Sequence, residues 1–149
     1  MDLSRLKWPL IILLVVGVGW LVSEGGVNYM HKKFTSASPG QDANVDEVNE
    51  AGLTRLGGFL LKTFRWEKAM AVLGDAVRIY PDGENALYNE YRMAKCAEKL
   101  GDYQRAVNIL GHLMDIEAGA VDARVPSNGH LDLRRAKLME TYELGEVGM

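Results

Sequence analysis

The feature that most constrains this chain is a run of uncharged residues, from Trp8 to Val22, close to its N-terminus. Trp8 and Tyr29 lie 21 positions apart, about 32 Å of α-helix at roughly 1.5 Å per residue. That length matches the ~30 Å hydrocarbon core of a bilayer, and aromatic residues at both ends suit its two interfaces. The run predicts a transmembrane helix over residues 8–30, preceded by a short tail of residues 1–7.

The same pattern leaves a second interpretation open, that of a cleaved signal peptide. Such peptides also carry basic residues, here Arg5 and Lys7, before an apolar core. Two observations favour an uncleaved anchor. The apolar run is longer than the usual core of a signal peptide, and Ser23-Glu24-Gly25 is a poor cleavage sequence.

Basic residues on the two sides of the span predict its orientation. Arg5, Lys7 and the terminal amine precede it, whereas Lys32 and Lys33 follow it. This balance slightly favours a cytoplasmic N-terminus. We therefore expect a single-pass membrane protein whose remaining residues lie on the far side, which for a bacterial inner membrane is the periplasm.

Three small residues of the predicted span recur at helical spacing. Gly19, Ser23 and Gly26 stand at i, i+4 and i+7, so one continuous helix would present them on one face. Small residues on one face let another helix approach closely in lipid. We expect these three residues to pack against a partner helix; the alternative is that glycine is simply common in membrane helices.

Residues 31–44 read as a juxtamembrane basic patch followed by a linker. His31, Lys32 and Lys33 form the patch, which we expect to meet lipid headgroups. The small polar residues after it end at Asn44, which with Glu47 resembles a capping box and predicts a helical domain over residues 45–149. This domain carries 17 acidic and 13 basic residues, and without a basic stripe nucleic-acid binding is not expected.

Beyond the linker the apolar residues recur at helical spacing and no strand pattern is present. The pattern predicts a helix over about 45–63 and a second one that ends at Pro81-Asp82-Gly83. A third is expected over about 84–100, and a fourth begins after Gly101-Asp102. A longer connection over 117–130 leads to a fifth helix over 131–144.

Two segments of this domain align with each other. Trp66-Glu67-Lys68-Ala69-Met70-Ala71-Val72-Leu73 matches Tyr103-Gln104-Arg105-Ala106-Val107-Asn108-Ile109-Leu110 at an offset of 37 residues. Together with Leu56-Gly57, Pro81 and Leu100-Gly101-Asp102, these segments resemble the tetratricopeptide (TPR) repeat family, over roughly residues 50–120. Glu90 and Leu113 depart from the family pattern, since the family has a bulky apolar residue and a small one there.

The resemblance implies an all-α fold, a transmembrane helix followed by a short α-solenoid of about two and a half repeats. The repeats would cover about 50–83 and 87–120, with a capping helix at about 131–145.

In this family the first helices of successive repeats line a protein-binding groove. Here the groove would be lined by Tyr88, Tyr91, Lys95, Lys99, Arg135 and Tyr142. The alternative is that these residues are ordinary surface, with Tyr91 in the core. The family's carboxylate clamp is not expected, because Thr54 and Gly58 replace its Lys and Asn.

The sequence offers little reaction chemistry. The three histidines, His31, His112 and His130, are far apart, and no His, Cys, Asp or Glu cluster has metal-ligand spacing. The single cysteine, Cys96, falls in a helix where a small buried residue is expected. We therefore expect no enzyme activity, no cofactor, no metal and no small-molecule substrate.

Two functional hypotheses remain. The first is a scaffold, an accessory subunit of a larger membrane protein complex that binds other subunits or peptide segments through its repeats and its membrane helix. Two and a half repeats bury little surface alone, which favours a permanent partner. The alternative is a chaperone or assembly factor near a translocation or cytochrome-maturation machine, an architecture with the same layout.

Overall fold

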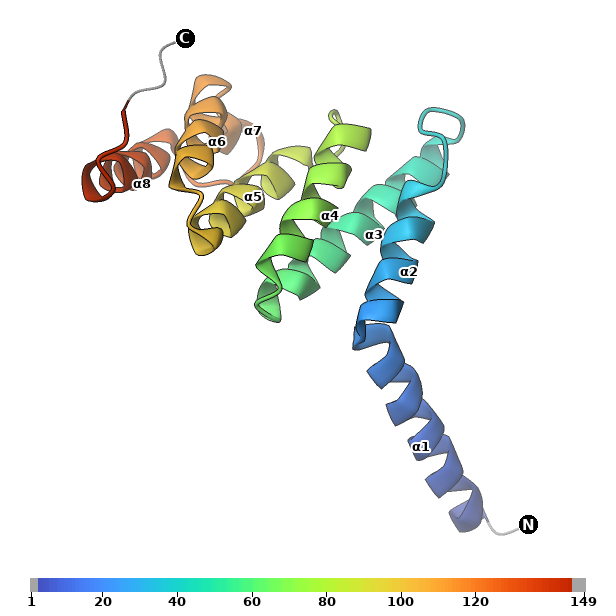
Figure 1. Cartoon of the computed structure of the whole chain (residues 1–149). Helices are drawn as coiled ribbons and strands as arrows, with labels where there is room; N and C mark the ends of the chain where they lie inside the picture. The colour runs from blue at the N-terminus through green and yellow to red at the C-terminus, as the bar shows by residue number, and fades with distance from the viewer. Residues whose placement is uncertain (1–2, 146–149) are drawn as a thin grey trace.

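The computed structural model describes residues 3–145, which form helices joined by turns and contain no strand. The prediction of an all-α fold is confirmed for these residues. The helices are α1 (Leu3–Val22), α2 (Glu24–Thr35), α3 (Ala43–Lys62), α4 (Trp66–Ile79), α5 (Ala86–Leu100), α6 (Tyr103–Asp115), α7 (Ala118–Val121) and α8 (Asn128–Thr141). Figure 1 shows α2 to α8 side by side in a row, with α1 projecting away from one end.

Each long helix of the row packs against the next, α3 on α4, α4 on α5, α5 on α6 and α6 on α8. One apolar cluster fills the space among α2, α3, α4, the second half of α5 and the start of α6, and a second lies among α5, α6, α7 and α8. The partly buried side chain of Leu138 packs against both clusters. Stacked helix pairs that contact mainly their neighbours make up an α-solenoid.

Small residues set the distance between paired helices. Ala69 of α4 and Ala106 of α6 are fully buried. Gly57 of α3 lies against the side chain of Leu73 in α4, so closely that a Cβ at position 57 would displace it. Leu73 itself is fully buried. These are the contacts that the aligned segments predict, small residues that admit the helix and leucines that fill the gap.

The turn between α5 and α6 has the expected chemistry. Gly101 adopts a left-handed conformation with φ 78°, and its N–H bonds to carbonyl groups of the last turn of α5. Asp102 then caps α6 by accepting a hydrogen bond from the N–H of Arg105. Glycine at a helix end and aspartate at a helix start are both favoured for these reasons.

The prediction of one continuous helix over residues 8–30 is wrong. The chain breaks at Ser23, and α1 and α2 meet at a bend of 66°. The Ser23 hydroxyl accepts a hydrogen bond from the Gly26 N–H and donates one to the carbonyl of Trp20, so it caps α2. Gly26 is buried against the backbone of Leu21, where any Cβ would collide. Gly19, Ser23 and Gly26 therefore do not share one face of one helix.

Residues 24–35 belong to the helical row and do not continue the apolar segment. Val27 is only 2% exposed in the first apolar cluster, and Met30 and Phe34 pack against it. His31 forms a 2.8 Å contact with the carboxylate of Asp75 in α4. The helical domain therefore begins at residue 24 instead of 45, and the linker shortens to residues 36–42.

Other helix ends differ from the predicted ones by a few residues. Asp42, not Asn44, caps α3 by accepting hydrogen bonds from the N–H groups of Asn44 and Val45. The last long helix begins at Asn128, three residues before the predicted start, and the short helix α7 was not predicted. Leu131 of α8 is buried and closes the second apolar cluster.

Among the described residues, no single helix has both the length and the hydropathy needed to cross a membrane. The two segments Lys7–Val22 and Glu24–Thr35 meet these criteria only when they are taken together, across their bend. The large apolar side chains of α1 are nevertheless all well exposed between Trp8 and Val22.

The packing of α3 on α4 generates a first prediction. Leu73→Ala removes a fully buried side chain and should lower the free energy of unfolding by about 2–5 kcal/mol. Val121→Ala, at a side chain that is 74% exposed, should change it by less than about 0.5 kcal/mol. Urea unfolding followed by helical circular dichroism measures both. Equal effects of the two substitutions would contradict the described core.

Candidate protein-binding surface

Helix α5 lies at the centre of the candidate surface. Its neighbours are α3 on one side, reached through Asn89 and Arg92, and α8 on the other, reached through Tyr91 and Glu98. The first helices of the successive pairs, α3, α5 and α8, are thus bridged by polar contacts along one side of the row. This is the arrangement that the predicted groove requires.

Towards α3 the surface is rigid and charged. The guanidinium carbons of Arg92 and Arg124 each lie 4.8 Å from the centroid of the Tyr88 ring, a distance at which a cation attracts an aromatic face. Arg92 also donates a hydrogen bond of 3.0 Å to the carbonyl of Thr54. Burial lowers the pKa of the Arg92 guanidinium. Tyr88 is therefore held in place by its neighbours.

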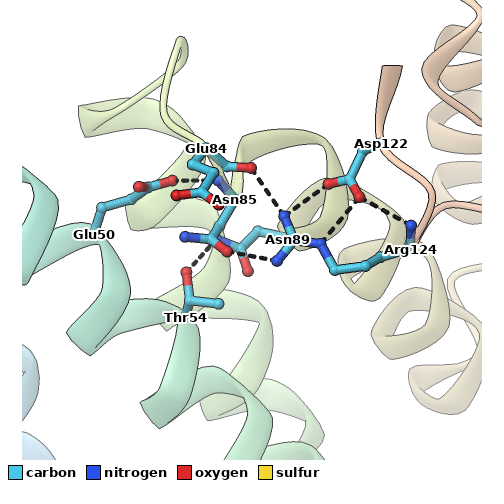
Figure 2. Close-up of polar contacts among 7 residues, drawn as sticks. All are labelled: Glu50, Thr54, Glu84, Asn85, Asn89, Asp122 and Arg124. Atoms are coloured by element: carbon cyan, nitrogen blue, oxygen red, sulfur yellow. Dashed lines mark hydrogen bonds and ion pairs between the residues drawn. The ribbon is translucent and has the colours of Figure 1, made fainter. Parts of the chain in front are cut away.

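Figure 2 shows the polar network that fixes this part of the surface. The side-chain amide of fully buried Asn89 donates a 2.8 Å hydrogen bond to the hydroxyl of Thr54. The buried carboxylate of Glu50 accepts the N–H of Asn85 at 2.7 Å. These bonds tie the start of α5 to α3. They also give hydrogen-bond partners to polar groups that would be costly to bury alone.

Arg124 extends the network to the segment between α7 and α8. It donates to the side chain of Asn85 at 2.7 Å and to the carbonyl of Glu84 at 2.9 Å. Two further bonds join it to Asp122, and these bonds hold the pKa of that carboxyl below its usual value. The loop after α7 is thus clamped onto the start of α5.

Towards α8 the surface opens into a groove of about 610 Å³. We call it the α5–α8 groove. It is lined by Tyr91, Glu98, Pro126, His130, Leu131, Leu133, Arg134, Lys137, Leu138, Thr141 and Tyr142. Apolar side chains alternate with basic ones along its α8 wall, and a groove of this character suits a protein segment with apolar anchors.

An ion pair joins the two walls of the groove. Glu98 of α5 accepts two hydrogen bonds from the guanidinium of Arg134 in α8, at 2.6 and 2.9 Å. This carboxylate raises the pKa of Arg134. A third, longer contact of 3.4 Å joins Arg134 to the hydroxyl of Tyr91, and the ammonium group of Lys95 lies 4.6 Å from the Tyr91 ring centroid.

The structure brings together some of the residues that the sequence predicted. Tyr91 and Tyr142 line the α5–α8 groove, although Tyr91 is only 7% exposed and contributes to the core as well. Lys95 adjoins the groove through its contact with Tyr91. Tyr142 stacks on Tyr103 of α6, with ring centroids 3.5 Å apart.

The other predicted residues lie elsewhere. Tyr88 belongs to the network beside α3, and the ammonium group of Lys99 lies 6.0 Å from the Trp66 ring in α4. Arg135 faces Gly111 of α6, so Arg134 occupies the place that we expected for Arg135. The pattern Leu131, Arg134, Leu138 at i, i+3 and i+7 would have indicated the correct face. That these residues bind a partner stays a prediction.

The described residues show no gathering of metal ligands, since no group of three or more His, Cys, Asp or Glu side chains among them has suitable geometry. His31 and His112 each pair with a single carboxylate, as in the 2.6 Å contact of His112 with Glu90, and His130 contacts the hydroxyl of Ser127. Glu90, which replaces an apolar residue of the family pattern, is thus accommodated by a polar partner.

The burial of Cys96 generates a second prediction. Burial raises the pKa of its thiol from 9.0 to about 11, so the thiolate fraction near pH 8 is about 100-fold lower than for an ordinary thiol. Reaction with Ellman's reagent should be at least that much slower in the folded protein than in urea. Equal rates in the two states would show that the thiol is accessible.

Comparison with known proteins supports the repeat architecture. Residues 88–116 match the family model described as Tetratricopeptide repeat. No curated protein and no solved structure matches the chain. The matched segment runs from the first turn of α5 to the residue after α6, so it contains one complete helix pair and the wall of the groove that α5 provides. The match supports a TPR-type protein, and such repeats are typically modules of protein–protein interaction.

Proposed function

We propose that this protein is a membrane-anchored scaffold that holds a partner protein in the α5–α8 groove, as an accessory subunit of a larger membrane complex. The observation that carries the proposal is the groove itself, which lies beside a TPR-type helix pair and has apolar and basic walls. Repeats of this kind serve protein–protein interaction, and the chemistry of the groove suits a protein segment.

Charge and shape define the segment that fits best. Leu133 is 70% exposed and, with the partly exposed Pro126, offers apolar contacts. Lys137 and His130 supply positive charge beside them. A segment with two or three apolar anchors and neighbouring acidic residues would complement both features.

The exposed apolar side chains of α1 support the anchor. Between Trp8 and Val22 the large apolar side chains are 43–74% exposed. Removing this surface from water would stabilise the protein by about 25 cal/mol per Å² of apolar area. Figure 1 shows α1 standing clear of the helical row. Within α1 the uncharged run from Trp8 to Val22 is about 22 Å long at roughly 1.5 Å per residue, and insertion into a bilayer, with α2 following across the bend, would cover its apolar side chains. The proposal places the N-terminus in the cytoplasm and the row of helices on the far side, in a bacterium the periplasm.

The anchor is tested by washing membranes that contain the full chain with alkaline carbonate. We expect the protein to remain in the membrane fraction with its N-terminal residues present, because an inserted apolar helix resists this treatment while a peripheral contact does not. An intact form that starts near Gly26 and is recovered from the wash would show that the segment is a signal peptide.

The groove is tested by co-purification in mild detergent. Leu133→Glu with Lys137→Glu should reduce the recovered partner at least tenfold, because both substitutions place acidic groups where the segment needs apolar and basic ones. Val121→Glu with Arg105→Glu, two exposed positions outside the groove, is the matched control. The helical circular dichroism of both variants should be unchanged.

Undiminished recovery of a partner at fixed stoichiometry would contradict the assignment of the groove. Many different proteins in transient cross-links, without a partner at fixed stoichiometry, would support the alternative of a chaperone or assembly factor instead.

A further inference from the structure

The α3–α4 turn, taken here as residues 62–68 with the last residue of α3 and the first three of α4, has two features that a surface turn seldom combines. Phe64 adopts a left-handed backbone conformation with φ 60°, which is unfavourable for a bulky residue. Its ring is 75% exposed and lies edge-on against Trp66, with the two centroids 5.6 Å apart. A strained turn thus holds an aromatic pair out towards the surroundings.

Positive charge surrounds this aromatic pair. Lys62 is exposed, Arg65 and Lys68 are partly exposed, and the ammonium group of Lys99 lies 6.0 Å from the Trp66 ring. Two carboxylates, Glu24 and Glu67, lie in the same region. The excess of basic over acidic groups favours an anionic surface.

The turn is fastened to the end of α1. The guanidinium of Arg65 donates a 3.1 Å hydrogen bond to the carbonyl of Val22, the last residue of that helix. The ammonium group of Lys68 contacts the carboxylate of Glu24 at 2.8 Å. Figure 1 shows the α3–α4 turn on the same edge of the row as the α1–α2 junction.

This position determines where the turn would lie relative to a bilayer that surrounds α1. The exposed apolar side chains of α1 continue to Val22, so a lipid phase that covers α1 would end beside the turn. The other ends of α3 and α4, away from this turn, have a different character. There a pocket is lined by the carboxylates of Asp46, Glu47, Glu50, Asp82 and Glu84 and by no basic residue.

We propose that the α3–α4 turn is a second membrane contact, which lies on anionic phospholipid headgroups with the rings of Phe64 and Trp66 among them. The inference rests on the proposed insertion of α1. Aromatic rings favour the headgroup level, and basic side chains are attracted to anionic headgroups beside them. With two points of contact the row of helices keeps a fixed tilt to the membrane, which presents the α5–α8 groove at a constant height.

The test uses the full chain with Trp8→Phe and Trp20→Phe, which leaves Trp66 as the only tryptophan. The protein is reconstituted into phosphatidylcholine vesicles with and without phosphatidylglycerol. We expect the Trp66 emission to shift to shorter wavelength and to be quenched by lipids brominated near the headgroup, several-fold more in the anionic vesicles. Flotation of the vesicles reports separately whether α1 is inserted.

Lys62→Glu with Phe64→Ser should abolish the difference in Trp66 quenching between anionic and neutral vesicles, while the protein still floats with both. Arg105→Glu with Val121→Ser, exposed positions elsewhere in the row, is the matched control and should keep it. Arg65 and Lys68 are left unchanged because they hold the α1–α2 junction.

The outcomes separate the two proposals. If the protein floats but Trp66 is not quenched, or is quenched equally in both kinds of vesicle, the second contact is wrong and the anchor stands. If the protein does not float, the insertion of α1 is wrong and the second contact is overturned with it.

Discussion

The hydrogen bonds of Ser23 decide how the rest of this structure is arranged. They end one helix and begin another, so the exposed apolar segment stops at Val22 and the helical row starts at Glu24. Because Gly26 allows the two helices to approach without a side chain between them, α2 can turn back onto α3. Without this break, Val27 would continue along the axis of α1 and leave the first apolar cluster uncovered.

The helices of the repeats were predictable because their signals are local. The spacing of apolar residues, with Gly101 and Asp102 as end and start signals, places α4, α5 and α6 within about two residues of their observed bounds. The separate identity of α2 was not predictable in the same way. Its inward residues Val27, Met30 and Phe34 come soon after the apolar run, and their spacing fits one continuous helix as well as two. The segment Ser23-Glu24-Gly25-Gly26, with a serine cap and an acidic first turn, was the local sign of the boundary.

The binding surface was predicted only in part, since its remaining contacts join residues far apart in the chain. Of the residues predicted on α5, Tyr91 lines the groove but is only 7% exposed, and Tyr88 lies apart in the network beside α3. The partnership of Arg134 with Glu98 depends on which face of α8 turns towards α5, and the sequence alone did not decide between Arg134 and Arg135. The network of Arg124 with Asn85 spans 39 residues, and no local pattern announces a contact of that kind.

Within the described residues, α8 packs on α6, and no second helix pairs with it to complete a repeat. Leu133 therefore stays exposed where a paired helix of a full repeat would cover it. Under the proposed function, a protein segment bound at this edge would cover Leu133, and its binding energy would add to the folding energy of α8. By mass action such a partner raises the free energy of unfolding by about 2.7 kcal/mol at a hundred times its Kd. The stability of α8 would then differ between the partner-bound and the partner-free protein. Proteases in the cell would degrade the partner-free protein faster, because its last helix unfolds more often.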